Sequence, residues 1–216
     1  MASLSDYLTE VRGRAESRLL STGSPSAVKS DVEAMANISL PLSAKYRYIN
    51  VEELLRENCG GKDRKESLTS LVKALIILEK YGCNLANPKR PKFWRTVKHN
   101  NPVFRNTLDV IKGGRATLHQ YGYTIQQPDG LSFPDDVTDP DVQKVAAVTV
   151  EVLALHAELA LFIKVKHLLT HPKSLLQLAL SLNSFMFIVC MHMSSWSSLI
   201  NKCSYFTGDA HPPRIP

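Results

Sequence analysis

The stretch "ESLTSLVKALIILEKYG", residues 66–82, has the clearest helical pattern in the sequence. Its apolar side chains recur every three or four residues, which places them on one face of a helix. That face consists of Leu68, Leu71, Val72, Leu75 and Leu78. Gly82 is the residue type that most often follows a helix end. We therefore predict an amphipathic helix that ends at Gly82 and buries its leucine face.

A second and longer helix is predicted to open at Asp139-Pro140 and to run to about Val165. Apolar residues occupy most of its positions, so most of its circumference should be buried. Its only regular polar stripe, spaced by seven residues, consists of Lys144, Glu151 and Glu158. This segment is the expected central helix of the domain.

Shorter elements are predicted around these two helices. Residues 4–20 and 28–35 have helical spacing, and Asn50 begins another helix as its cap. The segment "TIQQPDGLSF", residues 124–133, predicts two short strands around a Pro-Asp-Gly turn. The segment "KFWRTV", residues 92–97, predicts a short extended stretch, in which Trp94 faces the core and Phe93 faces the other way. The expected fold class is mainly α with a small β element.

Composition sets broad limits on the class of protein. The chain has 216 residues, 44% apolar and 21% charged, with a net charge of +6 that favours anionic partners. Its four cysteines form no C-x-x-C pair, so neither a zinc site nor a disulfide framework is supported, and no cofactor is expected. The N-terminus lacks the apolar core of a signal peptide, which favours a cytoplasmic protein. No catalytic set or phosphate-binding loop is present, so we expect no enzyme activity from this chain.

The segment "RPKFWRTVKHNN", residues 90–101, is rich in groups that bind ligands. It holds four Lys/Arg residues, a histidine and two large aromatics, with no acid. Asn101-Pro102 then predicts a new helix start, because asparagine is a good cap and proline suits the first helical position. Residues 89–105 contain six Lys/Arg residues and no acid, so the residues alone leave two functions open. One is an acidic-peptide site, and the other is a basic helical nucleic-acid-binding domain.

Several consecutive motifs resemble one family. The runs "LEKYG", "VKHNNPVFR", "GGR", "YGYT" and "QPDGLSFP" are similar to PUB domains of the HOIP type, over about Leu40 to Ile163. The resemblance implies a helical domain with a small β element that docks short peptides. It divides the chain into an N-terminal helical extension (1–36), a PUB domain (37–168) and a divergent apolar tail (169–216). In the family, the full-length protein is an E3 ligase that builds linear ubiquitin chains in NF-κB signalling, and its catalytic region is expected to be absent here.

The resemblance also implies a ligand and a site. HOIP-type PUB domains bind acidic, tyrosine-containing motifs of OTULIN, of the adaptor that brings in CYLD, and of the valosin-containing AAA ATPase. The matching positions in this chain are Tyr81, Asn84, Phe93, Lys98, Asn100, Asn101 and Val103. Phe93 stands where the family has tyrosine, so the ring is kept and the hydroxyl is lost. Lys98 would attract acids, the rings would hold an aromatic anchor, and the two asparagines would bond the peptide.

The amino-acid composition changes at the predicted tail. The run "LLQLALSLNSFMFIVCMHM", residues 175–193, is apolar but interrupted by polar residues. Three interpretations are open: a membrane anchor, a helix that packs on the domain, and a non-native terminus from alternative splicing or a mispredicted exon. The last is favoured, because composition and resemblance change near one point.

Overall fold

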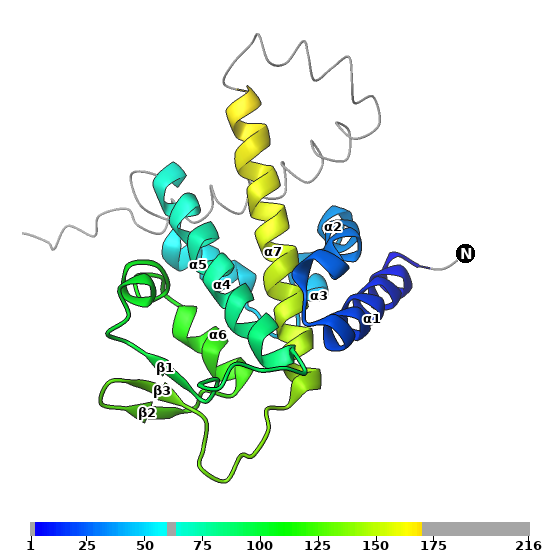
Figure 1. Cartoon of the computed structure of the whole chain (residues 1–216). Helices are drawn as coiled ribbons and strands as arrows, with labels where there is room; N and C mark the ends of the chain where they lie inside the picture. The colour runs from blue at the N-terminus through cyan, green and yellow to red at the C-terminus, as the bar shows by residue number, and fades with distance from the viewer. Residues whose placement is uncertain (1–2, 60–63, 170–216) are drawn as a thin grey trace, which may run out of the picture.

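The computed structural model describes residues 3–59 and 64–169, and the predicted tail lies outside these residues except for Leu169. Figure 1 shows a helical domain with a small sheet at one side, which confirms the predicted fold class. Its elements are α1 (Leu4–Thr22), a short 3₁₀ turn η1 (Pro25–Val28), α2 (Lys29–Asn37), α3 (Leu42–Lys45), α4 (Val51–Asn58), α5 (Arg64–Ala86), β1 (Thr96–Lys98), a π-helical turn η2 (Phe104–Leu108), α6 (Gly114–Tyr121), β2 (Ile125–Gln127), β3 (Gly130–Ser132) and α7 (Val142–Leu169).

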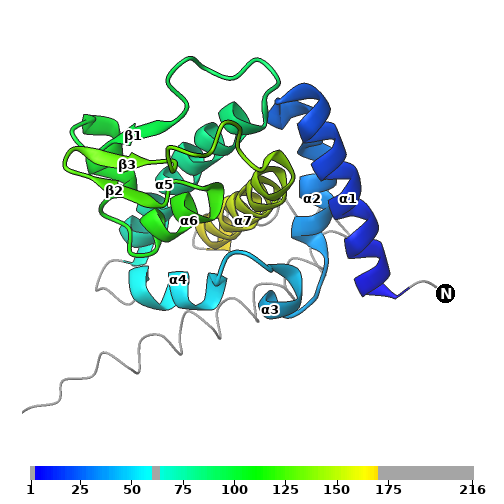
Figure 2. The ribbon, with the colours of Figure 1, turned by 90° about the horizontal axis from the view of Figure 1, so that it is seen from below.

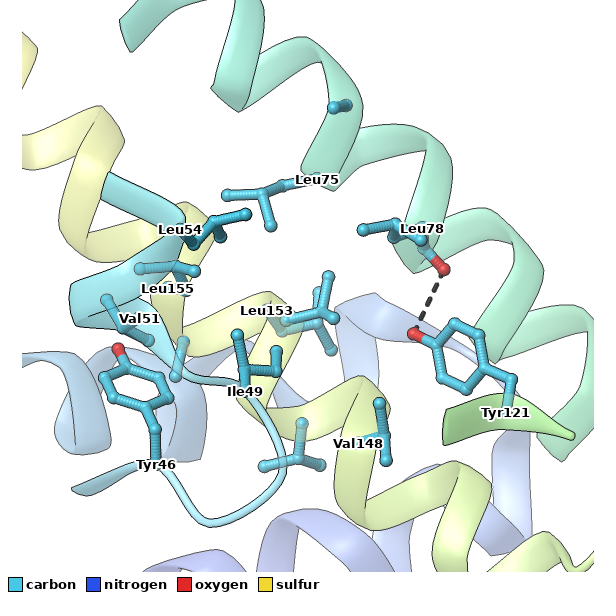
Figure 3. Close-up of a cluster of buried hydrophobic side chains, with 14 of the residues drawn as sticks. Tyr46, Ile49, Val51, Leu54, Leu75, Leu78, Tyr121, Val148, Leu153 and Leu155 are labelled. Atoms are coloured by element: carbon cyan, nitrogen blue, oxygen red, sulfur yellow. Dashed lines mark hydrogen bonds between the residues drawn. The ribbon is translucent and has the colours of Figure 1, made fainter. Parts of the chain in front are cut away.

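Helix α7 is the centre of the domain, as predicted. It contacts α5, α1, α2 and α6, and Figure 2 shows these elements arranged around its axis. The stretch 142–165 is long and apolar enough to span a membrane, but 72% of its most apolar window is buried inside the fold. Its hydrophobicity is therefore accounted for by core packing. Figure 3 shows Val148, Leu153 and Leu155 of α7 in this core, with Leu75 and Leu78 from the leucine face of α5.

Two residues of the polar stripe on α7 are also buried, which the sequence pattern did not indicate. The Glu151 carboxylate accepts the backbone N–H groups of residues 47, 48 and 49, at 2.8, 2.9 and 3.2 Å. Glu158 forms an ion pair with Lys45, which is 0% exposed. The Lys45 ammonium also donates to the carbonyls of Ala36 and Ile38, each at 2.9 Å. Burial of the Glu151 and Lys45 charges is tolerated because each has several partners, and the Glu158 charge is compensated by the Lys45 ammonium.

The N-terminal helices pack on the same central helix. The buried face of α1 contains Leu8, Val11, Ala15 and Leu19. Within that face, the Arg12 guanidinium donates to the Lys45 carbonyl at 2.6 Å. Both α1 and α2 contact α7. The core therefore continues across residue 36, and the domain boundaries proposed from the sequence stay a prediction.

Helix α5 does not end at Gly82 but continues to Ala86, so that predicted stop is wrong. The backbone at Gly82 is not in the left-handed conformation that a terminating glycine adopts. The glycine instead allows close packing, because a Cβ there would lie 2.1 Å from Thr149 Oγ1 and 2.6 Å from Tyr121 Oη. Tyr121 Oη donates to the Leu78 carbonyl at 3.2 Å, as Figure 3 shows.

The three strands form an antiparallel sheet in the order β1-β3-β2. The hairpin of β2 and β3 confirms the predicted turn. The extended stretch predicted at residues 92–97 is confirmed only at its end, because residues 92–95 form a turn and β1 covers residues 96–98. Trp94 packs edge-on against Phe133 with ring centroids 4.9 Å apart, whereas Phe93 is 78% exposed. Trp94 therefore packs on the core and Phe93 faces solvent, as predicted, but a turn at residues 92–95 separates the two rings rather than the alternation of a strand.

Candidate functional site

The segment from Lys98 to Val103 forms an exposed edge between β1 and η2. The side chains of Lys98, Asn100, Asn101 and Val103 are all exposed. Asn101 Oδ1 accepts the Val103 N–H at 2.9 Å, and the Asn101 carbonyl accepts the Arg105 N–H at 3.0 Å. These bonds confirm the predicted cap, although the helix that follows is only a π-helical turn. The cap uses one side-chain oxygen of Asn101, which leaves its amide N–H groups facing solvent.

The last turns of α5 supply Tyr81 and Asn84, and α5 packs against η2. Tyr81 is half-buried, and burial raises the pKa of its hydroxyl. Its ring meets the edge of Tyr123 at a centroid distance of 6.2 Å, and Tyr123 Oη in turn donates to the Trp94 carbonyl at 2.8 Å. Asn84 is exposed. Tyr81 is thus linked through Tyr123 to the segment that leads into β1, whereas Asn84 stands exposed on the helix.

Phe93 presents an exposed ring from the loop between α5 and β1. The Lys92 ammonium lies 5.9 Å from its ring centroid. Among the described residues, the aromatic ring that Tyr81 meets is that of Tyr123 rather than that of Phe93. Of the two predicted aromatic contacts, Tyr81 is thus half-buried and Phe93 is open to solvent.

The positive field is smaller than the local sequence indicates, because two cations of residues 90–101 face acids within the chain and the N–H groups of a third are occupied by carbonyls. Arg90 pairs with Asp139 at 3.3 Å, and Lys98 pairs with Asp129 at 3.2 Å. Arg95 donates to the carbonyls of residues 134 and 137. These partners come from segments far along the chain, so the composition of residues 90–101 gives no sign of them.

His99 adds little charge to this surface. Its ring stacks on Phe104 with centroids 5.1 Å apart and planes 17° apart. Burial lowers the pKa of His99, and the nearby Arg115 cation lowers it further. The imidazole is therefore expected to be neutral at pH 7, since the ordinary pKa is already about 6.5.

Other chemistry-bearing residues are accounted for by packing. Cys59 and Cys83 are buried, and burial raises the pKa of the Cys83 thiol to about 12. His156, which is half-buried, lies 3.4 Å from Glu79. Within residues 3–59 and 64–169, no group of three or more His, Cys, Asp or Glu is placed to hold a metal. A cavity of about 740 Å³ lies between α2 and α7, and none of the predicted site residues lines it.

Comparison with known proteins agrees with the motifs. Residues 68–147 match the family model described as "PUB domain". The E3 ubiquitin-protein ligase RNF31 of Homo sapiens is 53% identical over 135 residues, and that of Mus musculus is 51% identical over the same length. Each alignment covers 62% of this chain but only 12% of the relative.

Proposed function

We propose, from the premise that residues 68–147 form a PUB domain similar to that of RNF31, that this chain is a docking module for short peptide segments of partner proteins. The ligand is an acidic segment that contains a tyrosine. It binds along the β1–η2 edge and the end of α5. The observation that carries the proposal is the exposed run of Lys98, Asn100, Asn101 and Val103 inside the matched region.

The chemistry of this edge suits such a peptide. An extended peptide brings backbone N–H and C=O groups that must be bonded when they are covered. The amides of Asn100 and Asn101 offer both donors and acceptors. The half-buried Tyr81 and the open Phe93 give two aromatic contacts, of the kind that dominates peptide interfaces. Lys98 is the cation placed to meet a carboxylate of the ligand.

The alternative of a nucleic-acid-binding domain is weakened by the ion pairs. Affinity for nucleic acid depends on cations that are free to contact successive phosphates. Arg90, Arg95 and Lys98 instead have partners within the chain. Aromatic-anchored peptide binding needs fewer free cations, so it fits the same surface better.

Partners follow from the resemblance to the ligase. We propose acidic tyrosine motifs of the OTULIN type, of the CYLD-bridging adaptor and of the valosin-containing AAA ATPase as ligands, in the cytoplasm. The proposal assigns binding and no catalysis to this chain. Because the alignment covers 12% of RNF31, assembly of linear ubiquitin chains belongs to the relative's remaining length in this proposal.

Titration of the full chain into a fluorescently labelled, acidic peptide with a single tyrosine tests the proposal. Saturable binding is expected, and it should be lost when the peptide tyrosine becomes alanine. Double-stranded DNA of random sequence serves as the comparison, since its binding should fall steeply with added salt. Absence of saturable peptide binding, or equal affinity for the alanine peptide, would overturn the proposed function.

A further inference from the structure

Lys98, the cation proposed to bind a carboxylate of the ligand, already forms an ion pair with Asp129. Lys98 Nζ lies 3.2 Å from Asp129 Oδ2, and the two side chains are 63% and 56% exposed. An ion pair this open is worth little to stability, because water screens it and ordering two side chains costs entropy. It is nevertheless placed where it changes what Lys98 can bind.

The backbone fixes Asp129 beside Lys98. Lys98 is the register partner of Gly130 in the β1–β3 pair, so Asp129 in the adjoining turn lies next to it. The His99 N–H donates to the Asp129 carbonyl at 2.8 Å, which ties the turn to the end of β1. A Cβ at position 130 would lie 2.1 Å from the Val97 carbonyl oxygen, so glycine is needed for this approach. The pairing of β1 with β3 therefore fixes the backbone of Asp129 beside Lys98.

We infer that Asp129 is an internal competitor of the acidic ligand, a residue that sets specificity at the proposed peptide site. In the free chain its carboxylate occupies Lys98. A ligand carboxylate must replace it, and Asp129 then turns toward solvent. This inference rests on the proposed function, because it assigns a role to Asp129 in the same binding event.

The exchange makes the site selective for well-placed acids. A ligand carboxylate that contacts only Lys98 gains no binding free energy, because one exposed ion pair forms while another, between Lys98 and Asp129, is lost. A carboxylate positioned by the anchored tyrosine gains, because its approach to Lys98 becomes part of a single binding event. Nonspecific polyanions receive no such help, so Asp129 also discriminates against them.

Asp129→Asn is the test, because asparagine suits the same turn and keeps the carbonyl that accepts the His99 N–H. Binding of the acidic tyrosine peptide should become tighter by about two- to fivefold, the range that exposed ion pairs span. A peptide whose acids are replaced by amides should show no change. Glu57→Gln, on the exposed face of α4, makes the same change in net charge and should leave both affinities unaltered.

A Lys98→Gln background separates competition from simple repulsion between Asp129 and the ligand. With Lys98 absent there is nothing to compete for, so the gain from Asp129→Asn should disappear. A gain that persists there would overturn competition, as would unchanged or weaker binding by Asp129→Asn alone. If neither the wild type nor Asp129→Asn binds the peptide, the proposed function fails together with this inference. If the wild type binds and only the gain is missing, the inference fails alone.

Discussion

Asn101→Asp adds one negative charge to the proposed site with little expected change in the fold. Asn101 acts as a cap through a single acceptor oxygen, and aspartate caps as well as asparagine does. The free energy of unfolding should therefore change by less than about 0.5 kcal/mol. Binding should change far more, because the ligand is acidic. Two unit charges about 6 Å apart repel by roughly 0.7 kcal/mol in water and by about 3 kcal/mol at an effective dielectric constant of 20.

Affinity for the acidic tyrosine peptide should thus fall by about 3- to 100-fold. Calorimetry measures it at low and at high salt, and part of the loss should recover at high salt through screening. Asn101→Ser is the matched control, since serine also caps the turn and adds no charge. If Asn101→Asp and Asn101→Ser bind the peptide equally well, the ligand's acids do not approach Asn101 and the site is wrongly placed.

Four further outcomes follow from the structure. Phe93→Ala should leave thermal stability unchanged, because the ring is 78% exposed, yet weaken peptide binding about tenfold or more if the ring is an anchor; an unaltered affinity would remove it from the site. Phosphorylation of the ligand's tyrosine should abolish binding in calorimetry, because a dianion is hard to desolvate against an aromatic surface; tighter binding would mean that the cations dominate. Cys59 and Cys83 should resist iodoacetamide at about pH 8 in the folded chain, since both are buried and the pKa of Cys83 is about 12; mass spectrometry that finds either alkylated without unfolding contradicts this. Glu151→Gln should lower the free energy of unfolding by about 2–3 kcal/mol in urea titrations, because an amide cannot accept all three N–H groups; a change below about 1 kcal/mol would show that the loop is held by packing instead.

Much of the fold was predictable because its strongest signals are local. Apolar spacing identified α5 and α7, and the Pro-Asp-Gly turn identified the hairpin. The predicted helix end at Gly82 was wrong because the sequence alone does not distinguish a glycine needed for close packing from a glycine that ends a helix. The burial of Glu151 and Glu158 was missed for a related reason: their partners lie about a hundred residues earlier in the chain, and periodicity carries no information about distant partners.

The site shows the same limit in its electrostatics. The cap at Asn101 depends on adjacent residues and was predicted correctly. The free cations were overestimated, because Asp129 and Asp139 lie outside the basic segment and return to it only in the fold. One feature of the sequence pointed to Asp129, namely its place in the turn between the two predicted strands. If that hairpin pairs with the extended segment that ends at Lys98, Asp129 comes close to the basic segment. The strand register is needed to show that its partner is Lys98.

The two buried carboxylates of α7 also bear on how the chain folds during synthesis. Lys45 and the backbone of residues 47–49 are made early, yet their partners Glu151 and Glu158 are made about a hundred residues later. A nascent chain that has reached the β hairpin has α1 to α6 available but lacks the helix that covers them. We therefore expect the helices made before α7 to keep part of their apolar surface uncovered on the ribosome, and to complete their packing only when α7 emerges. Chaperones that bind exposed apolar segments should accordingly hold this chain until residue 158 has left the exit tunnel.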